Sequence, residues 1–390
     1  MVADISKYVG REQAFVKHFF LESYLESLIY KTASAYDEIA YVDGFSGPWQ
    51  SKGEDYSDTS FGIALAALRK AKATWKDHGK DVRMSAYLVE RSATAYANLE
   101  AIKDRFPDIA IHTFNNDFVA TAPTILSQIP ANAFAFFFID PKGWGIDIAQ
   151  LASLLKRPKS EVVFNFMFDF LNRAASIDDP KIIAALHALM PHGDWKDRLD
   201  AMETTVGDRS AARKSVLTDA FRQTLATVGS YEYVAEVPIL QRLKDRTLYS
   251  LIYGTRHAKG IEVFRDCHLK TERQQANVRA ATKRTYEEDK SGQGTLWGAD
   301  VRFAPDDTIA FLEGEKAAAS NTLLSLVPVT PDSTIYEKVW PRVLERHVVT
   351  HPDVNKLAAE LRKSGRLSFP GWEAGKRVPQ DAYRVSRPAP

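Results

Sequence analysis

The sequence predicts an α/β fold built on a mostly parallel, Rossmann-like sheet, and three observations lead to that prediction. Short apolar runs recur along the chain, each bounded by turn residues, and helical segments separate them. The first run, residues 39–43, ends in an acidic residue and a glycine-containing turn. A later run, residues 133–140, is the most apolar in the chain. Strands that alternate with helices at this spacing indicate βαβ units with right-handed connections.

Each element of this sheet follows from a local pattern. A stripe of apolar residues at helical spacing predicts a first helix over residues 15–30, packed on the edge of the sheet. A helical insertion is expected at about residues 169–229. The remaining strands are expected at 39–43, 84–89, 109–113, 133–140, 161–166, 233–240 and 247–255, and the remaining helices at 60–74, from Ser92 or Thr94 to 105, at 121–128 and at 147–156.

The C-terminal part has a different pattern. We expect the α/β domain to cover residues 1–330 and a second domain to cover 331–390, after a long helix (258–284) and a loop (286–307). Within the second domain, helices at 333–347 and 351–363 precede two apolar segments, 367–369 and 382–385, that predict a hairpin. Two helices followed by a hairpin are typical of a winged helix.

Charge favours nucleic acid as the ligand of this second domain. Residues 331–390 carry 11 Lys+Arg against 7 Asp+Glu, a net +4, whereas the whole chain carries +1. Clustered positive charge is the electrostatic signature of a nucleic-acid surface. Winged helices also dimerise or bind proteins, so both kinds of partner stay open.

Composition excludes several classes of protein. A single cysteine, Cys267, excludes internal disulfides and cysteine-cluster metal sites, and the histidines show no metal-ligand spacing, so no metal site is expected. The polar N-terminus lacks the apolar core of a signal peptide, and no apolar run reaches the ~20 residues that cross a bilayer. We therefore expect a soluble cytoplasmic protein that makes no use of a membrane.

Acidic residues end the first four strands. Asp43, Glu90, Asp117 and Asp140 each follow an apolar run. Because parallel strands open at the same edge, these residues are expected to line one crevice, where such sheets bind nucleotides. Glu90 is placed to accept hydrogen bonds from ribose hydroxyls, and Asp117 from an adenine amine. Any one of them alone is more often a helix cap or a loop end.

Four motifs in this order, YVDGFSGP, YLVERS, NNDF and FFFIDPKGWG, resemble those of class I S-adenosylmethionine-dependent methyltransferases. More closely, the chain resembles the three-Cys-motif partner protein family (TcmP), in which such motifs are joined to a C-terminal winged helix. The resemblance extends over most of the chain, including TLYSLIYGTRHAKGIEVF. It implies a methyltransferase sheet, S-adenosylmethionine as cofactor and a three-cysteine-motif protein as partner.

The resemblance also implies roles for individual residues. Glu90 would hold the ribose. Asp140 and Pro141 stand where N6-adenine methyltransferases keep a (D/N)-P-P-(Y/F/W) motif, which holds the target amine, and Trp144 would stack on a flipped-out base. The cofactor turn and the adenine site would be formed by Asp43, Gly44, Phe45, Gly47, Asp117 and Phe118.

Two positions depart from these patterns. Trp49 replaces the third glycine of the usual cofactor turn. Lys142 replaces the second proline, and the aromatic residue is delayed to Trp144. Lys7 and Lys17 precede the first strand and are candidates to reach a cofactor carboxylate or a phosphate, although solvated helix lysines are the simpler interpretation.

The sequence therefore leaves two functions open. The first is a methyltransferase that acts on a nucleic acid, with the exocyclic amine of a base as the target. The second is a non-enzymatic accessory protein that binds a nucleotide and the three-cysteine-motif partner. Cytosine-C5 methyl transfer needs a cysteine nucleophile near the sheet, and Cys267 lies far downstream. A nicotinamide enzyme is disfavoured because the full G-x-G-x-x-G turn is missing.

Overall fold

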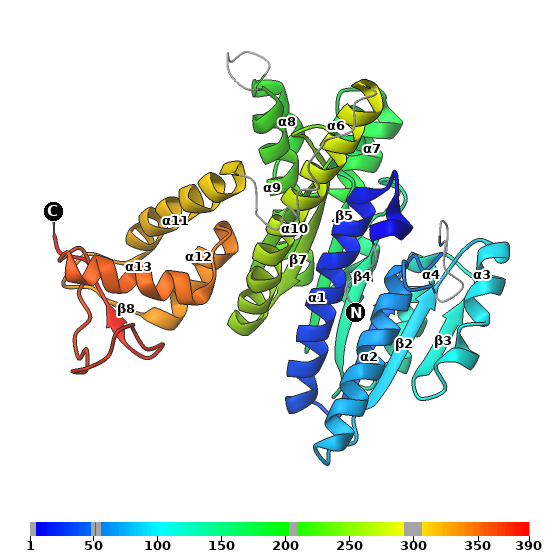
Figure 1. The fold of residues 1–390 in the computed structure, drawn as a ribbon, viewed down its shortest axis with the longest axis horizontal. Helices are drawn as coiled ribbons and strands as arrows, with labels where there is room; N and C mark the ends of the chain where they lie inside the picture. Colours follow the sequence, from blue (N-terminus) through cyan, green and yellow to red (C-terminus); the bar gives the residue numbers. More distant parts are fainter. Residues whose placement is uncertain (1–4, 48–50, 52–55, 203–208, 292–305, 390) are drawn as a thin grey trace. The chain divides into compact units, whose positions relative to one another are not determined.

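The computed structural model describes residues 5–47, 51, 56–202, 209–291 and 306–389 (Figure 1). The contacts divide the chain into two compact units, Met1–Arg256 and His257–Pro390. The boundary expected from the sequence, after residue 330, lies inside the second unit. The difference arises because α10 (Ala258–Ser291) and α11 (Asp306–Leu326) pack against the helices that follow them.

The first unit is organised around one seven-stranded sheet in the order β3-β2-β1-β4-β5-β7-β6. The first five strands of the chain run parallel, and β7 runs antiparallel to both β5 and β6. The sheet is therefore mixed, with five parallel strands and an antiparallel pair at one end. All seven expected strands are confirmed, with bounds β1 Glu38–Asp43, β2 Arg83–Val89, β3 Ala110–Phe114, β4 Phe134–Ile139, β5 Ser160–Phe166, β6 Tyr233–Leu240 and β7 Thr247–Thr255.

The first helix, α1 (Glu12–Ala35), covers one face of the sheet and lies beside α2 (Ser60–Asp77) (Figure 1). The Tyr24 ring of α1 lies 5.8 Å from the Phe136 ring of β4 and 5.5 Å from the Tyr253 ring of β7. The expectation that this helix packs on the edge of the sheet is therefore wrong, because its buried side chains reach the middle strands.

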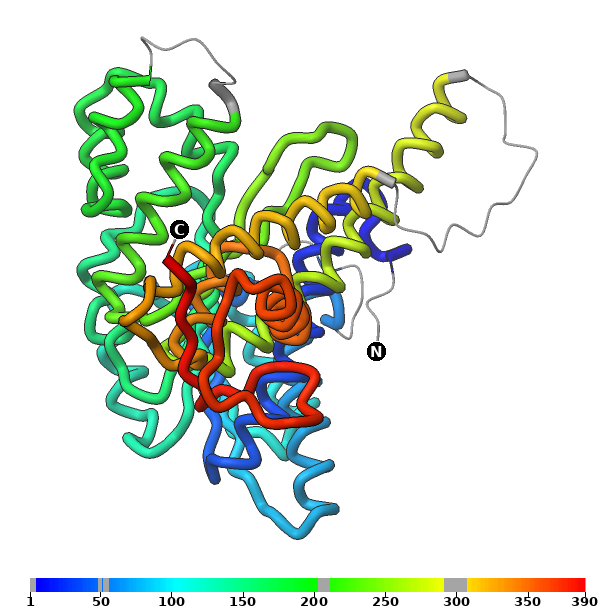
Figure 2. The backbone as a smooth tube through the Cα atoms, turned by 90° about the vertical axis from the view of Figure 1, so that its left-hand side faces the viewer, coloured from blue at the N-terminus to red at the C-terminus, as the bar shows by residue number. Residues whose placement is uncertain are grey.

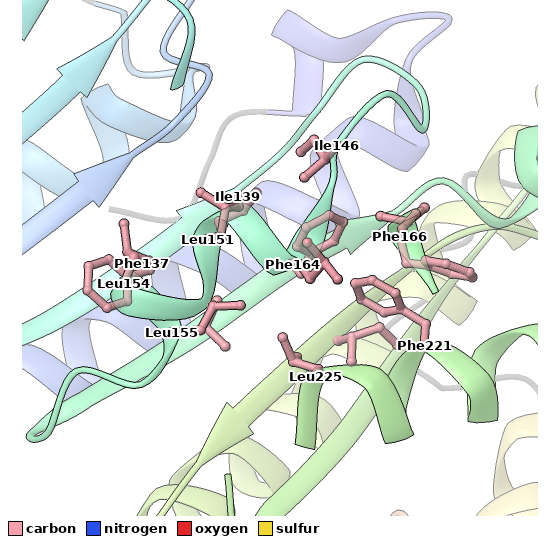
Figure 3. Close-up of a cluster of buried hydrophobic side chains, with 14 of the residues drawn as sticks. Phe137, Ile139, Ile146, Leu151, Leu154, Leu155, Phe164, Phe166, Phe221 and Leu225 are labelled. Carbon is pink, nitrogen blue, oxygen red and sulfur yellow. The ribbon is translucent and has the colours of Figure 1, made fainter. Parts of the chain in front are cut away.

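The opposite face carries the main apolar core (Figure 3). Side chains alternate along a strand, so Phe137 and Ile139 of β4 enter this core while Phe136 enters the other. Phe164 of β5 lies 4.7 Å from the Phe221 ring of α9 (Arg209–Gly229), centroid to centroid. Helices on both faces explain why β4 is a continuous apolar run.

Shorter helices complete the first unit. The expected helix at 147–156 is divided into a 3₁₀ turn (Ile148–Leu151) and α5 (Ala152–Leu155). The expected helical insertion is confirmed, and its helices lie beside one another in green in Figure 2. The remaining helical segments are two 3₁₀ turns, Ile5–Tyr8 and Lys103–Arg105, with α3 Ala93–Glu100, α4 Phe118–Gln128, α6 Phe168–Ala174, α7 Pro180–Leu189, α8 Trp195–Met202 and α9 Arg209–Gly229.

The second unit is helical with a small sheet. The helix α10 runs on to Ser291, so residues 286–291, expected as loop, are helical, and residues 292–305 of the expected loop lie outside the described part. The expected helix at 333–347 opens instead with β8 (Thr334–Ile335) and a 3₁₀ turn (Tyr336–Lys338) before α12 (Trp340–Arg346). The helix α13 (His351–Lys363) has the expected bounds.

The expected C-terminal hairpin is partly confirmed. Ser368, in the first apolar segment, forms one antiparallel bridge with Ser386, which directly follows the second segment. The two residues before Ser386, which form β9 (Arg384–Val385), pair with β8 rather than with the first segment. The small sheet is therefore closed by a strand that precedes α12.

The structure gives no sign of a membrane span or a metal cluster within its described residues. None of the helices that it describes is long and apolar enough to cross a bilayer. Cys267 is buried in α10, as expected for a small apolar residue. Among the described residues, no group of three potential ligands could hold a metal ion.

Candidate functional site

The turn after β1 is held by the carboxylate of Asp43, which is fully buried. Its Oδ1 accepts a hydrogen bond from the backbone N–H of Phe45 at 3.0 Å. Its Oδ2 accepts from the hydroxyls of Ser60 at 2.7 Å and of Tyr41 at 3.2 Å. All three hydrogen-bond donors are groups of the protein, so the buried carboxylate of Asp43 stabilises the turn from the protein interior.

Burial also changes the acidity of this group. Removal from water raises the pKa of Asp43 to about 6, because the charged form loses its hydration. The hydrogen bonds from Ser60 and Phe45 lower this pKa in part, and the nearby charge of Asp140 raises it. A carboxyl group with this pKa changes its protonation close to neutral pH.

Gly44 lies against an aromatic ring that leaves no space for a side chain. A Cβ at this position would lie 2.7 Å from two ring atoms of Phe118. Phe118 is buried and also meets Phe45 edge to face, with 5.8 Å between centroids. The two aromatic residues assigned to the cofactor site are therefore placed beneath the turn, where they pack against it and against each other.

Hydrogen bonds join this turn to the strands on both sides. The backbone N–H of Gly44 donates to the carbonyl of Phe138 in β4 at 3.1 Å. The N–H of Ser46 donates to the carbonyl of Val89 in β2 at 2.8 Å. Gly47, next in the chain, is half-buried, and Trp49 lies outside the described residues. The carboxyl ends of β2, β1 and β4 thus form one continuous edge.

Glu90 ends β2 at this edge and is almost completely buried. Its Oε1 accepts a hydrogen bond from the N–H of Ser92 at 2.5 Å, which fixes the carboxylate at the start of α3. The side-chain amide of Asn115, just after β3, donates to the backbone carbonyl of Glu90 at 2.9 Å. The end of β3 is thereby joined to the same edge.

Asp117 is exposed and caps α4. Its Oδ1 accepts hydrogen bonds from the N–H groups of Val119 at 2.9 Å and Ala120 at 3.3 Å. Capping fixes the orientation of the carboxylate while leaving it in contact with solvent. Asp117 therefore combines a capping role with an exposed carboxylate.

Asp140 follows β4 and joins three elements. Its Oδ2 accepts a 2.6 Å hydrogen bond from Lys17 Nζ of α1, in an ion pair whose side chains are 21% and 14% exposed. Its Oδ1 accepts from Asn165 Nδ2 at the end of β5. The sequence makes Lys17 a candidate for a cofactor carboxylate or a phosphate, but in the structure it is paired with Asp140.

The loop after Asp140 carries an aromatic pair. Pro141 is buried and Lys142 is exposed. Trp144 is half-buried, and its ring lies 4.6 Å from the ring of Phe170 in α6, which is 42% exposed. Gly143 permits this loop because its φ of +99° lies in the left-handed region that side chains disfavour. The other lysine considered, Lys7, donates to Ser57 at 2.7 Å.

The edge therefore brings together the residues expected from the strand ends, with two additions that the sequence did not identify. The sequence offers one signal for Asn165, since it is the amide that interrupts the apolar run of residues 162–166 in β5. No sequence signal distinguishes Phe170 from the neighbouring core residues. The ion pair of Lys17 with Asp140 joins positions 123 residues apart, which no local pattern specifies.

Comparisons with known proteins add little to this geometry. No family model matches the chain, and no curated protein matches it. Among solved structures, protein LPL1258 from Legionella pneumophila, of the family model DUF519, is 12% identical, with a TM-score of 0.36, over 61% of this chain and 84% of that one. Loganic acid methyltransferase with SAH is 8% identical, with a TM-score of 0.30, over 73% and 90% respectively. Likenesses this low carry nothing about the chemistry of the site.

Proposed function

We propose that the chain binds S-adenosylmethionine at the carboxyl edge of its sheet and methylates an exocyclic amine of a nucleic-acid base. One observation carries the proposal. Hydrogen bonds join the carboxyl ends of five adjacent strands into a single edge, and four of those ends bear Asp43, Glu90, Asp117 and Asp140. Ligands of open α/β sheets bind outside this edge.

The chemistry of two carboxylates fits the nucleoside part of the cofactor. Ribose hydroxyls and an adenine amine are hydrogen-bond donors, and ionised carboxylates are pure acceptors. Glu90 would hold the ribose, and the exposed Asp117 would take the amine. The inward-facing Asp43 would support the turn without touching the ligand. When bound, the cofactor would supply the methyl group.

Asp140 would position the amine that is methylated. A carboxylate has about four acceptor positions, and the hydrogen bonds from Lys17 and Asn165 use two of them. The remaining acceptor capacity would take an N–H of the amine and orient its nitrogen lone pair. Lys17 and Asn165 would fix the carboxylate, so that little ordering is needed on binding.

The second unit would hold the nucleic acid through a winged helix. Its elements run in the order α11, β8, α12, α13 and β9, with β9 paired to β8 and Ser386 bridged to Ser368. The net +4 of residues 331–390 supports an anionic ligand. A capping box in which Thr350 and Asp353 bond each other's backbone N–H gives α13 a defined start.

Calorimetry followed by methyl transfer tests the proposal. We expect heat on titration with S-adenosylmethionine and S-adenosylhomocysteine, none with NAD, and transfer of labelled methyl to RNA or DNA. Asp140→Ala should bind the cofactor but lose transfer by at least about 100-fold, because positioning supplies most of the rate gain. Full transfer by Asp140→Ala would contradict the role of this residue, and no heat with either sulfur compound would contradict cofactor binding.

An accessory function is the second candidate, and the surroundings of Asp140 favour it. Both carboxylate oxygens already accept hydrogen bonds from Lys17 and Asn165, as expected of a structural junction between α1, β4 and β5. In that case the partner would be the three-cysteine-motif protein. One result distinguishes the two functions. Cofactor binding together with methyl transfer to RNA or DNA supports the methyltransferase, and cofactor binding without transfer to any RNA or DNA supports the accessory function.

A further inference from the structure

We propose that Trp144 and Phe170 form a stacking platform for an unpaired base, so that the substrate is single-stranded nucleic acid. This inference rests on the proposed function and names its substrate class. Both rings reach the surface: Phe170 is 42% exposed, and Trp144, which packs against the apolar core, is half-buried. Exposed aromatic rings are the surfaces on which single-stranded bases stack, with little dependence on sequence.

The platform is attached directly to the proposed amine-binding group. Asp140 and Asn165 are joined by a hydrogen bond, and each begins one arm of the platform. Trp144 comes four residues after Asp140, and Phe170 comes five residues after Asn165. The two arms meet where the rings lie 4.6 Å apart, centroid to centroid. A base on these rings would lie on the loops that carry Asp140.

Positive charge beside the rings favours a nucleic acid over an uncharged aromatic ligand. The Arg173 guanidinium lies 5.5 Å from the centre of the Phe170 ring, and its side chain is 65% exposed. Arg173 forms a 3.5 Å ion pair with Asp169, and Arg246, in the hairpin between β6 and β7 and 43% exposed, forms a 2.6 Å ion pair with the same carboxylate. Two guanidinium groups share one carboxylate, so one positive charge remains in excess beside the rings. Arginines next to aromatic rings contribute both stacking and phosphate attraction.

Duplex nucleic acid does not fit this arrangement as well. Bases within a duplex stack on each other, and extruding one costs a few kcal/mol. The platform offers two rings, which would replace the stacking that a single-stranded base lacks. We therefore expect a preference for unpaired over paired strands.

Photo-crosslinking and binding together test the platform. The probe is a fluorescein-labelled single strand containing 5-iodouracil, used alone and annealed to its complement, with the full-length protein. We expect tighter binding of the single strand and crosslinks that map to Trp144 or Phe170. Phe170→Ala should weaken single-strand binding about 5- to 100-fold and abolish crosslinking at this position. Phe170→Tyr should preserve both.

Tyr30→Ala is the matched control. Tyr30 is 44% exposed and lies 5.3 Å from Trp75, a similar pair formed by α1 and α2. It lies near the C-terminal end of α1, whereas Lys17, closer to the start, reaches Asp140. Its removal should leave binding unchanged, and thermal unfolding of each variant shows whether the fold is kept.

Each outcome separates the platform from the proposed function. Crosslinks confined to other residues, or unchanged binding by Phe170→Ala, would overturn the platform even if the protein binds S-adenosylmethionine. Absence of cofactor binding in calorimetry, with crosslinks still at Trp144 or Phe170, would overturn methyl transfer and retain the platform.

Discussion

At the scale of single residues, Asp43 links the stability of the fold to pH. Its pKa in the folded state is about 6, and an unfolded aspartate titrates near 3.9. As pH rises from about 4, the unfolded chain releases this proton first, so stability falls. Above the folded pKa the full penalty is present, about 3 kcal/mol for a shift of roughly two pKa units.

The variant Asp43→Asn should remove this dependence. The amide keeps the shape of the carboxylate, and the hydroxyls of Ser60 and Tyr41 can reverse to accept from it. Between pH 5 and pH 8 the unfolding free energy of the wild type should fall by about 1 to 1.5 kcal/mol more than that of the variant. Denaturant unfolding at both pH values measures the difference.

Asp37→Asn provides the control, because that side chain is 74% exposed. It should follow the wild type at both pH values. Equal pH dependence of the wild type and Asp43→Asn would show that the buried carboxyl group does not titrate in this range.

Gly44 gives a second prediction at this scale. Gly44→Ala places a Cβ 2.7 Å from the Phe118 ring, so either the turn or the ring must move. We expect a loss of about 1 to 3 kcal/mol in unfolding free energy, as for other overpacked sites. The same change at Gly145, where a Cβ meets nothing within 4 Å, should cost less than about 0.5 kcal/mol. Similar costs at both positions would contradict the close packing of Phe118.

At the scale of elements, the sequence predicts what local patterns determine. Strand β4 is covered on both faces, so its apolar run is unbroken and its position could be read directly. Asp43, Glu90 and Asp140 were found for the same reason, since each directly follows such a run, whereas Asp117 comes after two asparagines. Strand β8 has two residues and exists only because β9 pairs with it, about 50 residues later. No pattern within so short a segment could identify it.

The partners of the candidate site lie beyond local patterns for a related reason. Lys17 occupies a helix position like those of many solvated lysines, and only the docking of α1 on the sheet brings it to Asp140. Phe170 lies close to the buried residues Phe168 and Leu171, and only the fold shows that its ring is exposed and meets Trp144. Sequence therefore specifies the strand ends better than the side chains that surround them.

At the scale of the whole molecule, the two parts of the chain differ in charge. Residues 331–390 carry a net +4, and the remainder carries −3. Nucleic acid should therefore be attracted mainly by the C-terminal segment, and raising the salt concentration should weaken binding steeply. A plot of log affinity against log salt concentration has a negative slope. Each lost phosphate contact makes this slope shallower by about 0.9 for duplex DNA and about 0.7 for single strands.

Exposed lysines of α13 allow this attraction to be measured. Lys356→Gln combined with Lys363→Gln removes two charges from that helix, and both side chains are exposed. We expect the slope of log affinity against log salt for a single-stranded oligonucleotide to become shallower by about 1.4. Affinity should fall by a similar factor for all sequences. Lys31→Gln with Lys76→Gln removes the same charge from exposed positions in α1 and α2. If both pairs change the slope equally, only net charge matters and α13 does not contact the phosphates; a slope made shallower by the α13 pair alone assigns the contacts to that helix.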